Sequence, residues 1–163
     1  MNNIEALMNQ IGGLVSSKVA PPIGLPRVER PFQIPDDLTE FYALCGGIEL
    51  YPEALYPVRI VSPQEVVPAN PVIVGKLCPE DISSSWYIIA TDSNGDYLTI
   101  DLHPGRLGRC YDSFFDSHGV PGSCPIIAKT FTELLSRLIE NQGKYWYWLG
   151  SDFVPIGDAY QSP

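Results

Sequence analysis

The dipeptide Asn94-Gly95, set between two apolar runs, is the feature that most constrains how this chain can fold. Both central residues of a two-residue type I′ turn need a positive φ, and Asn-Gly meets that need well. The flanking residues are rich in β-branched and aromatic side chains, as strands are. We therefore expect residues 86–102 to form a β-hairpin at the centre of a sheet.

A two-residue turn at this point also predicts the register, because strand partners are counted outward from the turn. One face then carries mostly apolar side chains, which we expect to be buried: Tyr87, Ile89, Thr91, Leu98, Ile100 and Leu102. The other face is half polar, and we expect it to be partly open: Ile88, Ala90, Asp92, Tyr97, Thr99 and Asp101. A shift by one residue would exchange the two faces, so the apolar pattern supports this register.

Three segments carry apolar side chains at helical spacing: residues 4–15, 35–45 and 131–142. Pro35 suits a first helical position, and we expect Gly46-Gly47 to end the second helix with a left-handed cap. Thr130 and Glu133 form a capping box at the start of the last helix. Phe114 and Phe115 are expected to tuck against the sheet.

Further short strands are expected at residues 48–51, 58–61 and 109–112, with Val72-Ile73-Val74 as a candidate edge strand. The pattern predicts an α+β fold, in which a mostly antiparallel twisted sheet of about five to six strands has helices packed on one side. We expect one domain over residues 1–163, which divides as follows: an N-terminal helix (1–20), a proline-rich connection (21–34), a core (35–142) and an aromatic C-terminal extension (143–163).

The formal net charge of −9, from 19 acidic and 10 basic residues, bears on the kind of partner. A negative field repels phosphate backbones, so nucleic acid is not expected as a direct partner. A basic protein would instead be attracted. An acidic surface that serves only to keep the protein dispersed explains the charge equally well.

The four cysteines do not indicate a metal site, because none forms a C-x-x-C pair and only His103 and His118 could complete one. We expect both histidines on surface loops and no metal or cofactor. The N-terminus lacks the pattern of a secretory signal, and no apolar run approaches the ~20 residues needed to cross a bilayer. We therefore expect a cytoplasmic protein with free, mostly buried thiols.

No P-loop, nucleophile elbow or zinc-protease motif is present in the sequence. One acidic constellation remains to be weighed: Asp92, Asp96, Asp101, Asp112 and Asp116. These carboxylates could bind a divalent cation or act as an acid/base pair. The alternative, which we favour, is that two of them flank the turn and the others lie on a solvated face. Trp146 and Trp148 could likewise form a binding edge or, as we favour, seal the core.

The chain resembles the SUKH superfamily, which comprises fungal cell-wall-assembly regulators and bacterial immunity proteins. Four ordered motifs carry the resemblance over residues 25–142: Ile34-Pro-Asp-Asp-Leu-Thr-Glu-Phe-Tyr with Gly46-Gly47, the hairpin, Arg109-Cys-Tyr-Asp, and Ile127-Ala-Lys-Thr-Phe-Thr-Glu-Leu-Leu. Two segments depart from the pattern, the proline-rich stretch 62–85 and the aromatic tail after residue 143. The resemblance implies an α+β fold, no enzymatic activity, and binding of a cognate toxin, often a nuclease, in the producing cell.

The expected function is therefore that of a non-catalytic protein-binding module, an immunity protein that neutralises a bacterial toxin by direct binding. A basic nuclease is the toxin that the acidic charge fits best. The alternatives are a carboxylate-based or divalent-metal-dependent hydrolase and a regulatory scaffold protein. The residues expected to bind the partner lie on or beside the open hairpin face: Asp92, Asp96, Tyr97, Asp101, Tyr111 and Asp112.

Overall fold

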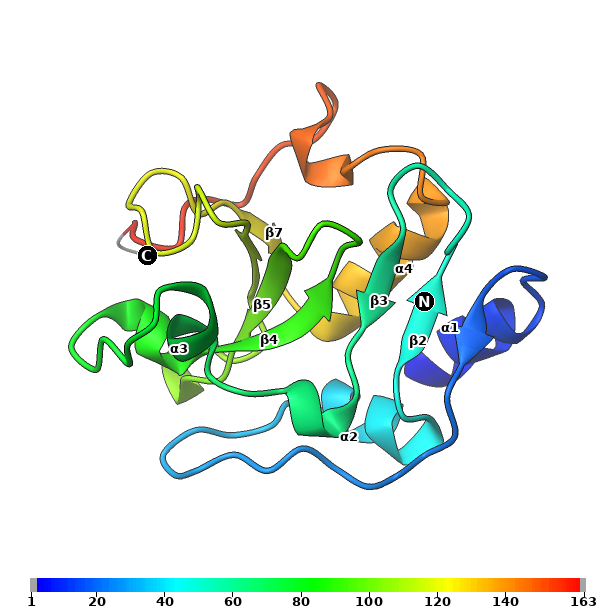
Figure 1. Cartoon of the computed structure of the whole chain (residues 1–163), viewed down its shortest axis with the longest axis horizontal. Helices are drawn as coiled ribbons and strands as arrows, with labels where there is room; N and C mark the ends of the chain where they lie inside the picture. The colour runs from blue at the N-terminus through cyan, green and yellow to red at the C-terminus, as the bar shows by residue number, and fades with distance from the viewer. Residues whose placement is uncertain (1–2, 162–163) are drawn as a thin grey trace.

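The computed structural model describes residues 3–161 and shows one antiparallel sheet of seven strands (Figure 1). The strands are β1 (Lys18–Val19), β2 (Ile48–Leu50), β3 (Val58–Ile60), β4 (Trp86–Thr91), β5 (Tyr97–Asp101), β6 (Cys110–Ser113) and β7 (Ile126–Ala128). Their order in the sheet is their order in the chain, so each strand pairs with the next one. The α+β prediction is confirmed, with more strands than expected.

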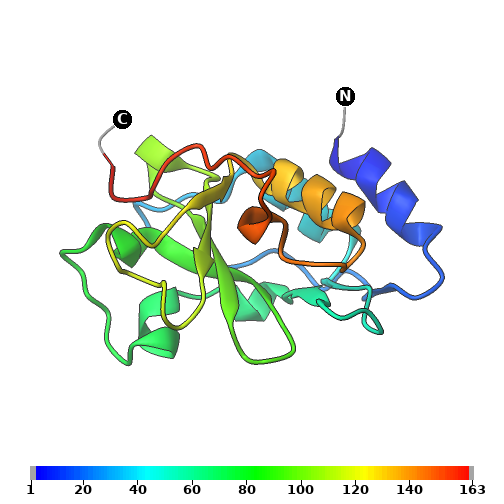
Figure 2. The ribbon, with the colours of Figure 1, turned by 90° about the horizontal axis from the view of Figure 1, so that it is seen from above.

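Three helices pack against one another on one face of this sheet (Figure 2): α1 (Ile4–Gly12), α2 (Asp36–Leu44) and α4 (Phe131–Asn141). The predicted apolar stripes of α2 and α4 are buried, with Phe41 of α2 in edge contact with Phe131 of α4. The first helix ends at Gly12, short of residue 15, the end of its predicted apolar stripe, and Val15 is fully exposed. The short helix α3 (Ala69–Ile73) lies on the opposite face (Figure 2). Four 3₁₀ turns complete the fold: η1 (Pro63–Glu65), η2 (Ile82–Ser85), η3 (Pro104–Arg106) and η4 (Tyr147–Leu149).

The central hairpin forms, but its turn is longer than the sequence predicts. Asp92 N–H donates to the carbonyl of Asp96 at 3.1 Å, which leaves a three-residue loop, and only Gly95 in that loop has a positive φ, of 86°. A β-bulge between Ile88 and Ala90 then shifts the register again. The predicted type I′ turn and its strand partners are therefore wrong.

The bulge changes which β4 side chains share a face with β5. Ala90 lies opposite Leu98 and Thr91 opposite Tyr97, whereas Trp86 lies opposite Asp101. The face assignment of β5 survives, because Leu98 and its even-numbered neighbours still point into the main core. The assignment of Ala90 and Thr91 is reversed.

The Gly46-Gly47 pair serves a different purpose from the predicted helix cap. α2 ends at Cys45, whose backbone is extended (φ −156°), so no left-handed residue caps the helix. Gly46 and Gly47 instead exchange hydrogen bonds with Ala20, of 2.9 and 3.0 Å. A Cβ on Gly46 would lie 2.4 Å from the carbonyl oxygen of Pro21, so glycine is needed for this close approach of two backbones.

The predicted open face of the hairpin is covered where it meets β6 and β7. A second, smaller core forms there from Trp86, Tyr111, Cys124, Ile126 and Ala159. The loop before β7 and the C-terminal segment around Ala159 cover it. A hydrogen bond of 2.8 Å from Ala159 N–H to the carbonyl of Cys124 joins these two segments. This face stays accessible on the β1–β3 side, where Glu49 and Arg59 are half-buried and Lys18 is exposed.

Four local predictions have mixed outcomes. The candidate edge strand Val72-Ile73-Val74 is wrong, since these residues end α3. His118 is buried rather than on the surface, and Phe115 is 79% exposed rather than tucked in. The thiol prediction is confirmed: all four cysteines are free, and only Cys78 is not buried. None of the helices within residues 3–161 has the length and apolar character that a membrane span needs.

Candidate protein-binding surface

Asp101, one of the residues predicted to bind a partner, is completely buried. Its Oδ1 accepts hydrogen bonds from the Ser85 hydroxyl at 2.6 Å and from the His103 N–H at 3.0 Å. Its Oδ2 accepts from Arg106 Nε at 2.9 Å and from the Tyr111 hydroxyl at 2.7 Å. The carboxylate therefore ties β5 to η2, η3 and β6 and has no exposed atom to offer a partner.

Tyr111 and Asp112 are also buried, so the expectation that they lie on an open face is wrong. Burial and the neighbouring Asp101 charge raise the pKa of Tyr111, which keeps its hydroxyl a donor. Asp112 accepts from the Phe114 N–H at 2.9 Å and from the Trp148 indole N–H at 3.0 Å. Burial raises the pKa of the Asp112 carboxyl in spite of these hydrogen bonds.

Asp92 and Asp96 do reach the surface at the tip of the hairpin, where each is partly exposed. Asp92 Oδ1 accepts from the N–H groups of Asn94 and Asp96, at 2.9 and 2.8 Å, and so shapes the turn. Asp96 Oδ1 accepts from the Phe115 N–H at 2.9 Å and fastens the next loop to the tip. Within residues 3–161 the second oxygen of each carboxylate takes no hydrogen bond, so both remain available to a partner.

Aromatic side chains surround this tip. Phe115 is 79% exposed, and its neighbour Phe114 packs edge-on against Trp146 at 5.7 Å. Trp146 stacks on Trp148 at 5.4 Å and contacts Tyr56 at 5.0 Å. Trp148 is buried in the core, as favoured, whereas Trp146 is partly exposed. We call the resulting surface the hairpin end; it comprises Tyr56, Asp92, Asp96, Tyr97, Phe115, Asp116 and Trp146.

A groove of about 240 Å³ adjoins the hairpin end. It is lined by Glu49, Leu50, Pro52, Pro57, Val58, Arg59, Thr91, Asp92 and Ser93. Arg59 is held there by a two-pronged ion pair with Glu65, with N–O distances of 2.7 and 2.9 Å. These hydrogen bonds lower the pKa of Glu65 to about 2 and raise the pKa of Arg59. The nearby Tyr97 also raises the pKa of Arg59.

The arrangement is suited to non-covalent binding of a protein. Exposed aromatics beside carboxylates are the side chains that anchor interfaces and select a basic partner. Sequence reasoning missed Phe115 and Tyr56, and the only available signal was the Phe114-Phe115 pair in a loop. Among residues 3–161 no three His, Cys, Asp or Glu side chains are grouped so as to hold a metal ion.

Comparisons with known proteins agree with the resemblance read from the motifs. The sequence profile of the SMI1 / KNR4 family (SUKH-1) matches residues 29–137. The immunity protein YokJ of Bacillus subtilis (strain 168) is 52% identical over 158 residues, which cover 97% of this chain and 96% of that protein. No solved structure matches the chain significantly. With two-thirds of its length matched by the profile, the chain belongs to the SMI1 / KNR4 family (SUKH-1).

Proposed function

We propose that this chain is a non-catalytic immunity protein that neutralises a toxin by binding it directly. The observation that carries the proposal is its 52% identity, over nearly its whole length, to a protein named an immunity protein. The buried positions of Asp101 and Asp112 support the non-catalytic part, because both oxygens of each carboxylate accept hydrogen bonds from the chain itself. Neither is free to act as an acid, a base or a metal ligand.

The hairpin end is the proposed contact surface. Phe115 presents an aromatic ring to solvent, and burial of such a ring is what the strongest interface residues contribute. Asp92, Asp96 and Asp116 place three carboxylates around it. Of the residues first expected to bind the partner, only Asp92, Asp96 and Tyr97 remain in this proposal, because Asp101, Tyr111 and Asp112 are buried.

The proposed partner is a basic toxin domain, such as a nuclease, met in the cytoplasm of the producing cell. The net charge of −9 favours a basic protein over nucleic acid. An acidic surface that covers the substrate site of a nuclease would stop that enzyme from reaching nucleic acid.

The test is co-expression with the toxin encoded by the neighbouring gene, followed by co-purification and a growth assay. We expect a complex that survives purification and restores growth. If this chain neither binds nor protects against that toxin, the proposed function is wrong.

Two sets of variants locate the surface. The triple change D92N/D96N/D116N removes three charges but keeps the acceptor oxygens, and should slow association on the order of tenfold at low salt. Phe115→Ala should speed dissociation by about tenfold or more. The matched controls are E5Q/E80Q/E140Q and Val15→Ala, at exposed positions outside the hairpin end. Equal binding by variants and controls would place the interface elsewhere.

A further inference from the structure

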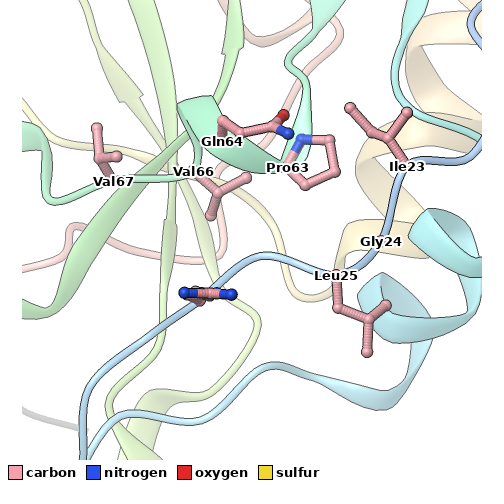
Figure 3. Close-up of a pocket in the computed structure, with 8 residues that line it drawn as sticks. Ile23, Gly24, Leu25, Pro63, Gln64, Val66 and Val67 are labelled. Carbon is pink, nitrogen blue, oxygen red and sulfur yellow. The ribbon is translucent and has the colours of Figure 1, made fainter.

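A second groove lies at the opposite end of β3 from the hairpin end. Val58, the first residue of β3, lines the groove beside the hairpin. The 3₁₀ turn η1, which comes after β3 in the chain, lines the second groove. Its volume is about 650 Å³, within the range of ligand-binding pockets. Figure 3 shows its two walls, Ile23, Gly24 and Leu25 on one and Pro63, Gln64, Val66 and Val67 on the other.

The first wall presents apolar side chains to the groove, whereas on the other wall Val66 is only 2% exposed and Pro63 is buried. Ile23 and Leu25 are 56% and 49% exposed, on a segment that has no regular structure. These side chains would gain stability from being covered, at roughly 25 cal/mol per Å² of apolar surface. The groove is therefore suited to side chains of a similar kind.

The first wall also has a backbone without partners. Within residues 3–161, no hydrogen bond is formed by the backbone of residues 22–28, although Ile23, Gly24, Leu25 and Arg27 each have an N–H donor. On the other wall the N–H of Val67 is likewise without a partner, although its carbonyl accepts from Ile88 at 2.9 Å. A backbone with free donors and acceptors can pair with a further strand, and here the positive φ of Gly24 (109°) places that pairing on the residues after it.

Arg27 supplies the charge. It lines the groove, and it forms no ion pair or hydrogen bond with any other residue of the described chain. In a protein of net charge −9, an arginine without an acidic partner is well placed to bind a carboxylate from outside. The amide of Gln64 adds a further polar group without a partner.

We propose that this groove binds an extended peptide segment of another protein, with apolar side chains on either side of an aspartate or glutamate that pairs with Arg27. Backbone hydrogen bonds to residues 25–28 would give affinity, and the apolar first wall with Arg27 would give selectivity. The site is separate from the hairpin end, so the groove and the proposed toxin-binding surface can be tested independently.

The experiment selects binders to the full chain from random peptides of about seven residues, as many as the segment 22–28 contains. One library has amidated C-termini and the other has free C-termini. We expect the amidated library to yield peptides in which β-branched residues flank an acidic one. Failure to enrich any sequence, or enrichment only among free C-termini, overturns the proposal.

Variants then place the selected peptide. Arg27→Glu should weaken its binding at least on the order of tenfold, and a peptide with lysine in place of its acid should bind that variant better than the unchanged protein. The matched control is Arg30→Glu, an equal charge change at an exposed residue that does not line the groove. Methylation of alternate peptide nitrogens should abolish binding. If Arg27→Glu and Arg30→Glu behave alike, the peptide binds elsewhere.

A comparison of two variants separates this proposal from the proposed function. D92N/D96N/D116N should leave peptide binding unchanged while it weakens toxin binding, and Arg27→Glu should do the reverse. Loss of peptide binding in the hairpin-end variant would show that the two sites are one and would overturn the separate groove.

Discussion

At the scale of single residues, Asp101 shows how a polar side chain in a strand can be structural rather than exposed. Its carboxylate is fully buried and paired with Arg106, whose side chain is 24% exposed. A buried carboxylate is stable only if its partners replace the water it loses. Ser85, His103 and Tyr111 supply the remaining hydrogen bonds. Loss of this one group would leave several donors without an acceptor.

We therefore expect Asp101→Ala to lower the free energy of unfolding by about 3–5 kcal/mol, as removal of one partner of a buried ion pair does. Urea unfolding followed by tryptophan fluorescence measures this change. Asp116→Ala, at an exposed carboxylate, is the control and should change stability by less than about 0.5 kcal/mol. A loss at Asp101 as small as that at Asp116 would contradict the buried network.

His118 predicts how stability responds to pH. Its Nε2 lies 2.6 Å from Asn70 Oδ1, and because the Asn70 amide nitrogen donates elsewhere, Oδ1 is the acceptor and Nε2 carries the proton. Burial lowers the pKa of His118 to about 4, although the nearby Asp81 charge acts in the other direction. The imidazole is therefore neutral in the folded protein at neutral pH.

The unfolded chain takes up this proton near pH 6.5 but the folded chain only near pH 4, so stability should fall as the pH drops through that window. At about 1.4 kcal/mol per pKa unit, the loss over the whole window is about 3.5 kcal/mol, of which about 2 kcal/mol is reached by pH 5. Urea midpoints between pH 7 and pH 5 measure it, and His118→Gln should flatten the slope. Glu65 has a pKa of about 2, so its ion pair loses its contribution to stability only below the ordinary pKa of a glutamate. It therefore does not affect the urea midpoints between pH 7 and pH 5. An unchanged slope in His118→Gln would exclude this residue as the cause.

At the scale of elements, local patterns predicted α1, α2, α4 and five of the seven strands, but not β1, β7 or α3. The helix starts were predicted because they carry specific signals. Asn3 caps α1, Thr130 caps α4, and the Ser62–Glu65 capping box opens η1, all as their side chains suggest. The hairpin was found for the same reason. Its register was not, because the chain turns over three residues rather than two. The bulge at Ile88 and Ala90 then shifts the register again, and it depends on packing across the sheet and leaves no local pattern.

Of the proposed contact surface, the sequence predicted only the residues beside the turn. Asp92 and Asp96 lie at the tip because polar residues beside a turn are solvated on local grounds alone. Asp101 lies on the predicted face, yet it is buried by Ser85, Arg106 and Tyr111. Asp112 lies opposite Leu98 on the main-core face, where the distant Trp148 donates to it. Alternation predicts the face on which a side chain lies, but not what covers that face.

The Gly47 position gives a prediction at this scale. Its φ of 119° favours glycine, and a Cβ there would lie 2.8 Å from the carbonyl oxygen of Ile60. Gly47→Ala should therefore destabilise the protein by more than the ~1–2 kcal/mol of backbone strain alone. Gly12→Ala is the matched control, because nothing lies within 4 Å of its Cβ and alanine favours helices. Chemical denaturation of both variants should give opposite signs, and equal stability of the two would show that the packing of Gly47 against Ile60 does not need glycine.

At the scale of the whole molecule, the two cores on either side of the sheet differ in how they are held. The main core is closed by three helices, whereas the second core depends on the last residues of the chain. Asp158 accepts from the Cys124 N–H at 2.8 Å, and Tyr160 donates to Asp81 at 2.7 Å. The C-terminal segment therefore covers the second core. Cys124 lies in that core and Cys45 and Cys110 lie in the main core, so the reactivity of each thiol shows whether its own core is exposed.

Thiol labelling of the native protein should reveal one rapidly reacting cysteine, Cys78, which alone is not buried. Burial raises the pKa of Cys124 to about 11 and so suppresses its reactive thiolate. Deletion of residues 156–163 should uncover Cys124 and add a second rapid thiol, while Cys45 and Cys110 stay slow in the main core. Cys124→Ser in the deleted protein should restore a single rapid thiol. If the deletion instead makes all four thiols react rapidly, the C-terminal segment holds the whole fold together, because the main core then does not persist without its neighbour.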